Sequence, residues 1–115
     1  MLAEIENPLA SAVLTWIPAD NGGRRSGPPT APVYSATAAF RLGDDTQPGW
    51  PAVADQVSIL LQRMSQLPTE TENVKVGFLF PELAAPFVKP GAEFVVLEGP
   101  KVVATGVIKE VFNWV

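Results

Sequence analysis

Residues 92–112 read AEFVVLEGPKVVATGVIKEVF. Two runs in this stretch, residues 94–97 and 101–111, are rich in Val, Ile and Phe, which suit the pleated surface of a sheet. Between them, Gly99-Pro100 is typical of a tight primed turn, because glycine accepts a positive φ and proline restricts φ. The stretch therefore predicts an antiparallel hairpin. Gly106, inside its second strand, indicates a bulge or a close approach of another backbone.

Three further segments predict strands from their apolar faces and β-branched or aromatic content. They are residues 11–17 (SAVLTWI), 33–42 (VYSATAAFRL) and 74–80 (VKVGFLF). A chain of 115 residues has the length of one domain. About six strands joined by short connections predict an all-β fold, a small closed antiparallel barrel that spans residues 1–115 as a single domain.

The segment from Ala52 to Gln66 is ambiguous. Its apolar residues recur at helical spacing, and its Leu, Gln, Arg and Met content favours a helix. Val57, Ile59 and Leu61 also alternate with polar residues, as in a strand. A short helix and an extended strand over residues 57–63 therefore both remain open from the residues alone.

The composition limits the classes of protein to which this chain can belong. Hydrophobic residues make up 47% of the chain and charged residues 17%, which is typical of a globular protein. The net charge of −4 offers no basic excess for phosphate binding, so a general nucleic-acid binder is disfavoured. No apolar run approaches the ~20 residues of a membrane span. Residues 1–6 lack the layout of a signal peptide, so we expect a cytoplasmic protein without membrane contact.

Residues that carry catalysis are scarce. The chain has no Cys and no His, which removes thiolate chemistry, the common nucleophilic triads and the commonest metal ligand. A phosphate-binding loop motif is also missing. Asp44-Asp45 could hold a hard cation, but adjacent aspartates are more often turn residues. We therefore expect no enzyme activity, no metal site and no cofactor.

The sequence offers binding residues in its longest irregular stretch, residues 18–32 (PADNGGRRSGPPTAP). Long loops in compact domains are functional or disordered. Gly22-Gly23-Arg24-Arg25 holds the chain's only adjacent pair of basic residues, and two guanidinium groups there could reach a carboxylate or a phosphate. The alternative is a solvated loop of turn residues. Trp50 is a second candidate, as a lid on the core or as an exposed contact residue.

The hairpin and the loop together resemble a known family, the C-terminal or third β-barrel domain of translation elongation factor Tu. The hairpin pattern is carried by Pro90, Gly91, Phe94, Glu98, Gly99, Lys101, Val103, Gly106 and Val107. Gly22-Gly23-Arg24 and Pro32 resemble the same domain's Gly-Gly-Arg loop and the strand that follows it. The resemblance covers most of the chain apart from roughly Gly43 to Glu72. It implies strands in place of a helix around residues 57–63.

The resemblance also implies partners. In that family the third domain contacts the T-arm backbone of aminoacyl-tRNA and proteins such as the exchange factor, whereas GTP hydrolysis belongs to another domain. Arg24, Glu98 and Gly99 match the tRNA side. Pro100 stands for the second glycine of the family's Glu-Gly-Gly-Arg motif and Lys101 for its arginine, so a backbone donor and a bidentate fork are lost. These changes and the net charge disfavour tRNA.

The sequence thus predicts a non-catalytic, stand-alone module that binds an unidentified protein. Its expected binding face combines residues 22–25, the hairpin tip at residues 98–101, including Glu98, Gly99 and Lys101, and Trp50. The alternatives are a tRNA-binding module and an inhibitor or immunity-type protein. Residues 98–101 can equally serve as a hairpin turn and nothing more.

Overall fold

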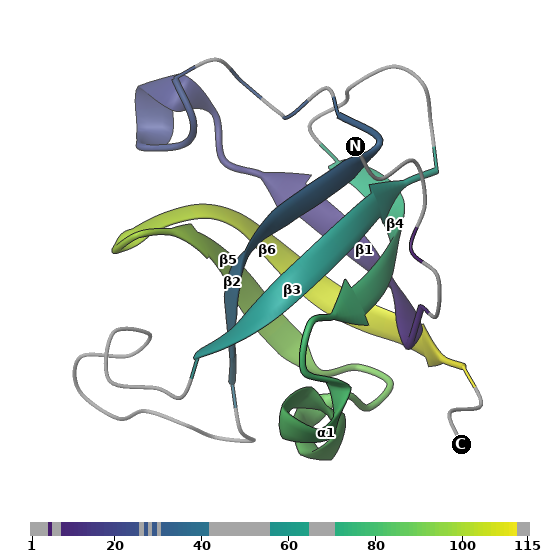
Figure 1. The fold of residues 1–115 in the computed structure, drawn as a ribbon. Helices are drawn as coiled ribbons and strands as arrows, with labels where there is room; N and C mark the ends of the chain where they lie inside the picture. Colours follow the sequence, from purple (N-terminus) through teal and green to yellow (C-terminus); the bar gives the residue numbers. More distant parts are fainter. Residues whose placement is uncertain are drawn as a thin grey trace.

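The computed structural model describes residues 5, 8–25, 27, 29, 31–41, 56–64 and 71–112. These residues form a closed antiparallel barrel of six strands, in the spatial order β1-β4-β3-β2-β5-β6 (Figure 1). The strands are β1 (Ala10–Trp16), β2 (Val33–Phe40), β3 (Gln56–Arg63), β4 (Thr71–Phe78), β5 (Glu93–Glu98) and β6 (Lys101–Val111). The predicted all-β barrel is confirmed.

Alternation along the strands fills the barrel interior. In β1, Ala10, Ala12, Leu14 and Trp16 are buried and the residues between them are partly exposed. In β4, Val74, Val76 and Phe78 are buried in the same way. The side chains that are less than 2% exposed include Phe94, Leu14, Ile59, Leu61, Ile108, Val74, Val76, Val96 and Val103. The barrel is therefore a packed core and not an open channel.

Strand β3 resolves the ambiguity around Ala52–Gln66. Residues 56–63 are extended and pair with β2 on one side and β4 on the other. Ile59 and Leu61 point into the core, at 0% and 1% exposure. The helical alternative is wrong for this part of the segment, because ladder hydrogen bonds to two neighbours outweigh local propensity. Residues 52–55 and 65–66 lie outside the described part of the chain.

The hairpin of β5 and β6 is confirmed. Glu98 pairs with Lys101, and Gly99 has φ +61. A register shift lies between Val96 and Leu97, and it leaves Val103 as the extra residue on β6. The bulge therefore does not lie at Gly106, where the sequence predicted a bulge or the close approach of another backbone.

Gly106 instead makes room for a side chain. It is paired with Phe94 across the hairpin, and the Phe94 ring lies inside the barrel against the Gly106 backbone. A Cβ atom at position 106 would lie well inside van der Waals contact with three carbon atoms of that ring. Phe94 also packs against Phe40, with 5.2 Å between ring centroids. Phe94, the largest of the core side chains that are less than 2% exposed, thus depends on a glycine in the neighbouring strand.

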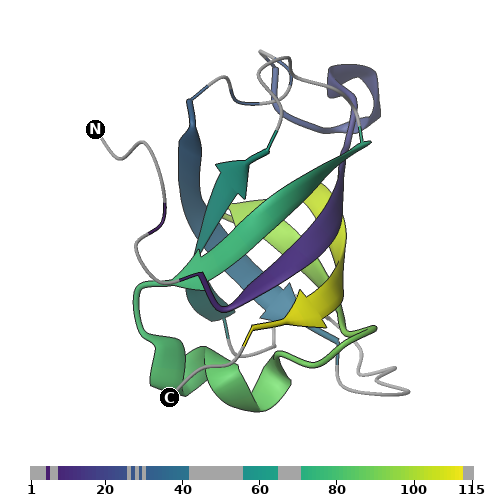
Figure 2. The ribbon, with the colours of Figure 1, turned by 90° about the vertical axis from the view of Figure 1, so that its right-hand side faces the viewer.

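A short helical segment closes one end of the barrel. It consists of α1 (Pro81–Ala84) and the 3₁₀ turn η2 (Ala85–Phe87), and another 3₁₀ turn, η1 (Ala19–Asn21), lies at the opposite end. Figure 2 shows α1 below the strands, outside the barrel wall. Ala84 is buried, so one side of α1 faces the core. Within the described residues, no helix has the length and apolar character needed to cross a membrane.

The contact between Gly106 and Phe94 predicts a stability effect. Gly106→Ala should destabilise the barrel by about 1–3 kcal/mol, because the added methyl group overpacks a filled core. In the double variant Gly106→Ala/Phe94→Leu, the loss should be smaller than the sum of the two single losses. Urea unfolding followed by tryptophan fluorescence measures both effects. The exposed neighbour Thr105→Ala is the control, and equal losses at positions 105 and 106 would contradict the packing account.

Candidate functional site

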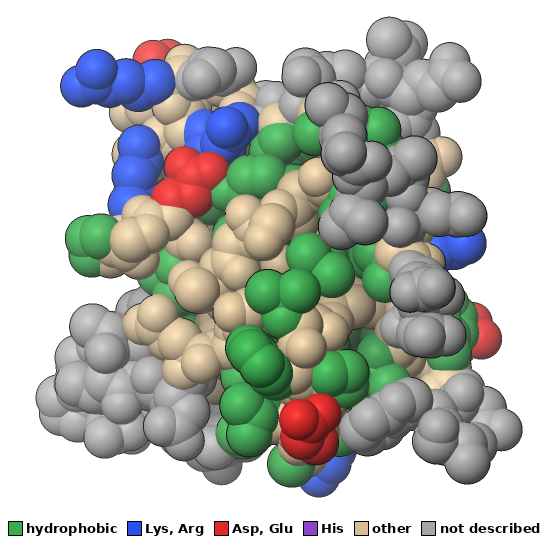
Figure 3. Space-filling view, in the orientation of Figure 1, with side chains coloured by type: hydrophobic (Ala, Val, Ile, Leu, Met, Phe, Trp, Pro, Cys, Tyr) green, Lys and Arg blue, Asp and Glu red, His purple; other side chains and the backbone are tan. Residues whose placement is uncertain are grey.

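The structure brings the predicted loop and the predicted hairpin tip together. Arg24 Nε donates to Glu98 Oε2 at 2.8 Å, although the two residues are 74 positions apart in the chain. The loop reaches the tip at the end of the barrel where η1 and the β5–β6 turn lie (Figure 1). In Figure 3 the Lys and Arg side chains gather around an acidic group in the same region. This surface, residues 22–25 with 98–101, is called the hairpin-tip face below.

Arg24 is engaged within the protein. Its Nη1 donates to the Gly27 carbonyl at 2.7 Å, and its guanidinium carbon lies 5.5 Å from the centroid of the Tyr34 ring. The Tyr34 hydroxyl donates to the Glu98 Oε2 atom that also accepts from Arg24. Charge-assisted hydrogen bonds of this kind hold the guanidinium in one orientation. Arg24 therefore fixes the loop to the hairpin instead of presenting a free fork to solvent.

The cluster shifts the pKa values of its two acids. Burial tends to raise the pKa of Glu98, but hydrogen bonds from Tyr34 and Arg24 and the charges of Arg24 and Lys101 outweigh it and lower that pKa. The pKa of Tyr34 is raised by burial, by its hydrogen bond to Glu98 and by the charge of Glu98. Glu98 is therefore held as an anion and Tyr34 as a neutral donor.

The glycines of the hairpin-tip face have structural roles. Gly22 has φ +94 and ends η1 in the left-handed conformation. Gly23 is buried, its N–H donates to the Pro18 carbonyl at 2.9 Å, and a Cβ atom would clash with the carbonyl of Ile17. Gly99 supplies the positive φ of the hairpin turn. All three therefore set the shape of the loop and the tip.

The other predicted site residues differ in their surroundings. Arg25 and Lys101 are exposed, as expected of a contact surface. Trp50 and Asp44-Asp45 lie outside the described residues. Tyr34 was missed as a member of the cluster, although it belongs to the apolar face of the strand predicted over residues 33–42. It is the second residue of β2, so its hydroxyl reaches the barrel end.

A buried ion pair lies below the hairpin-tip face. Arg63 Nη2 lies 3.3 Å from Glu72 Oε2, and both side chains are less than 10% exposed. Trp16 Nε1 donates to the same oxygen at 2.8 Å, and Arg63 Nη1 donates to the carbonyl of Pro29. Glu72 Oε1 is buried without a hydrogen-bond partner. Arg63 thus ties the long loop to β3 and β4.

Residues 68–73 (PTETEN) are polar and predict a solvated acidic connector that includes Glu72, but for Glu72 this prediction is wrong. Strand β4 begins at Thr71, and Glu72 is only 6% exposed. The signal was present, since counting back in twos from Val76 and Val74 places Glu72 on the inward face.

A second surface has no counterpart in the sequence expectations. Leu79, Phe80 and Leu83 are 56%, 56% and 60% exposed where β4 passes into α1. Phe80 is the N-cap residue that precedes α1, and Leu83 N in α1 donates to the Phe80 carbonyl at 3.0 Å, so the two residues are one turn apart. Hydrophobic side chains gather at this end of the barrel in Figure 3. These three residues, with Glu82 between them, are called the α1 knob below.

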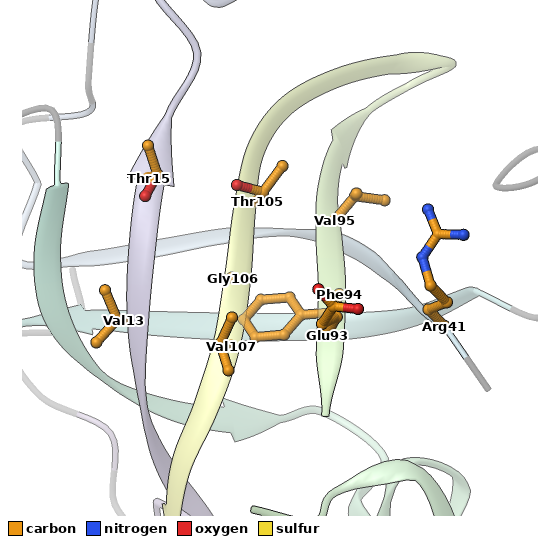
Figure 4. A pocket seen from close by; sticks show the side chains of 9 residues that line it. All are labelled: Val13, Thr15, Arg41, Glu93, Phe94, Val95, Thr105, Gly106 and Val107. Atoms are coloured by element: carbon orange, nitrogen blue, oxygen red, sulfur yellow. The ribbon is translucent and has the colours of Figure 1, made fainter. Parts of the chain in front are cut away.

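The outer wall of the barrel carries a small open pocket of about 190 Å³. Figure 4 shows that it lies across β1, β6 and β5. Cross-strand pairing places Val13 beside Val107 and Thr15 beside Thr105, so the pocket is a trough between two rows of side chains. Its floor includes Gly106 and Phe94, and Glu93 and Arg41 lie at one end. This volume fits one side chain and is smaller than typical ligand sites of ~300–1,000 Å³.

Comparisons with known proteins add no assignment. No family model matches the chain, and no curated protein matches its sequence. Within the described residues there is also no group of three or more Asp, Glu, His or Cys side chains placed to hold a metal ion.

The lowered pKa of Glu98 predicts the pH dependence of stability. A carboxyl group whose pKa is lower in the folded state stabilises the fold above its ordinary pKa, about 4.5, and loses this effect as the pH falls toward the folded value. Glu98→Gln should therefore cost up to ~1 kcal/mol at pH 7, because the site is partly exposed and screened, and progressively less as the pH is lowered from about 4.5 toward about 2. Urea unfolding across this range measures the difference.

The matched control is Glu110→Gln, an exposed carboxyl group on β6. Its effect should stay within ~0.5 kcal/mol at every pH. If the cost of Glu98→Gln did not depend on pH, the Arg24–Glu98–Tyr34 account of this site would be wrong.

Proposed function

We propose that this chain is a non-catalytic β-barrel module that binds another protein, with the α1 knob as its contact surface. The observation that carries the proposal is the exposure of Leu79, Phe80 and Leu83 within five consecutive residues. The largest apolar patch on a typical soluble monomer measures ~300–600 Å² and is often a functional site. Burying these three side chains against a partner would contribute ~25 cal/mol of binding free energy for each Å² of apolar surface removed from water.

A hydrogen bond and core packing hold the backbone of the α1 knob in place. Leu79 N donates to the Ser58 carbonyl of β3 at 3.2 Å, and Ala84 packs into the core cluster. Pro81 at the start of α1 restricts the backbone further. A pre-organised apolar surface loses little conformational entropy on binding, which favours its use as an anchor.

The closed barrel directs partners toward such a surface. Every described strand pairs with two neighbours, so none has an edge that is free along its whole length, although β2 pairs with β5 only over Thr37–Phe40. The ends and the outer face of the barrel therefore offer a partner more surface than a strand edge does. Among the described residues, the α1 knob offers the largest exposed apolar side chains that are consecutive or one turn apart.

The hairpin-tip face supports this choice of a protein over tRNA. The Arg24 guanidinium, which matches a tRNA-side position of elongation factor Tu, is occupied by Glu98, Gly27 and Tyr34. The net charge of −4 adds electrostatic repulsion against a phosphate backbone. We also propose, from the hairpin pattern and the six-stranded barrel, that the module shares descent with that factor's third domain and acts in the cytoplasm.

Site-specific crosslinking tests the proposal. A photoreactive amino acid at Leu83, in the full chain expressed in its native cells, should give a discrete adduct with one other protein. Adding Phe80→Ala should abolish it, because the anchor is removed. Once that partner is purified, Phe80→Ala/Leu83→Ala should weaken its binding about 30-fold or more, as expected for apolar hot spots.

The control position is Met64, which is 58% exposed and lies at the end of β3. A crosslinker there, and the variant Met64→Ala, should have no effect on the complex. Adducts that form equally from positions 64 and 83, or no adduct from position 83, would contradict the proposal.

A further inference from the structure

The charge within the α1 knob restricts the kind of partner that can cover it. Glu82 is exposed and lies in the chain between Phe80 and Leu83. The three apolar side chains expose roughly 300 Å², if a whole large side chain contributes ~150–250 Å². A stable interface buries at least ~600 Å² on each partner. The interface must therefore extend beyond the apolar trio, and Glu82 then lies within it or at its rim.

Glu82 makes a second copy of this chain a poor occupant. A twofold dimer joins the same patch on both subunits, so a small patch centred on the axis would bring the two Glu82 carboxylates close together. Like charges that face each other at an interface cost binding energy, and the net charge of −4 on each copy adds to the repulsion. Charge thus favours, as the occupant of the α1 knob, a protein other than a second copy of this chain, with Lys or Arg side chains around its own apolar surface.

The geometry of the knob fits the face of a helix. Phe80 and Leu83 start and end a single hydrogen-bonded turn, so their side chains form a short ridge with the spacing of a helical surface. Ridges of this spacing pack into the grooves between apolar side chains on another helix. Figure 2 shows that the segment lies below the strands, at an end of the barrel and not on its wall.

We propose that the α1 knob docks on an amphipathic helix of its partner whose apolar stripe is bordered by Lys or Arg. Phe80, Leu83 and Leu79 pack on the stripe, and Glu82 pairs with a bordering cation. This inference rests on the proposed protein-binding function and adds the chemistry of the partner. A bordering acidic residue would instead repel Glu82, so the knob selects its helix by charge.

Model helices test this selectivity. The probes are a 14-residue amphipathic peptide of Leu and Lys and its counterpart of Leu and Glu, each titrated into the isotope-labelled full chain and followed by amide NMR shifts. The Leu/Lys peptide should shift residues 79–84 and bind about tenfold or more tightly than the Leu/Glu peptide. Glu82→Gln should weaken the Leu/Lys complex about threefold to fivefold, the size of one exposed ion pair. Glu82→Lys should reverse the preference.

Asp20→Asn is the matched control, since it removes one exposed negative charge at the opposite end of the barrel. It should leave the affinity unchanged within about twofold. If both peptides bind the knob equally, charge selection is wrong and the apolar docking surface stands. Shifts away from residues 79–84, or the absence of binding, would overturn the docking surface as well. Concentration-dependent shifts of the knob without peptide would identify a second copy as the occupant and also overturn the proposal.

Discussion

Closure of the six-stranded sheet is the constraint on which the rest of the structure depends. Because β2 pairs with β5 and β1 with β6, every strand has two neighbours and the inward side chains share one interior. The Phe94 ring occupies that interior only because Gly106 lacks a side chain. Closure also leaves no described strand with an edge that is free along its whole length, which favours binding at loops, ends and the outer wall.

The side chains at the two ends of the barrel differ in whether they make contacts within the protein. At one end, two carboxylates are paired within the protein: Arg24 and Tyr34 bind Glu98, and Arg63 and Trp16 bind one oxygen of Glu72. These contacts tie the long loop to the strands. At the other end, α1 buries Ala84 but leaves Phe80 and its neighbours in solvent. The end at which charged side chains pair with each other suits a structural role, and the end with exposed apolar side chains suits recognition.

Much of the barrel was predictable because its strands have a clear period and its hairpin has explicit turn residues. Strand β3 was ambiguous, since residues 56–63 suit a helix locally and only pairing with β2 and β4 settles their conformation. The loop and the tip were placed in one face, but the sequence does not reveal that Arg24 and Glu98 satisfy each other. Phe80 continues the alternation of β4, yet the strand ends at Phe78 and α1 begins at Pro81, which turns Phe80 outward. These outcomes depend on contacts between residues that are far apart in the sequence. The periodicity of apolar residues within one segment carries no information about such contacts.

The central claim is that the end of the barrel with α1, and not the hairpin-tip face, is the surface that a partner covers. Hydroxyl-radical footprinting of the full chain, alone and in its purified complex, tests it most directly. The account predicts that Leu79, Phe80 and Leu83 become protected from oxidation in the complex, while Tyr34 and Met64 react at unchanged rates. Protection centred on Tyr34 and the 98–101 turn, with Phe80 and Leu83 still reactive, would contradict it.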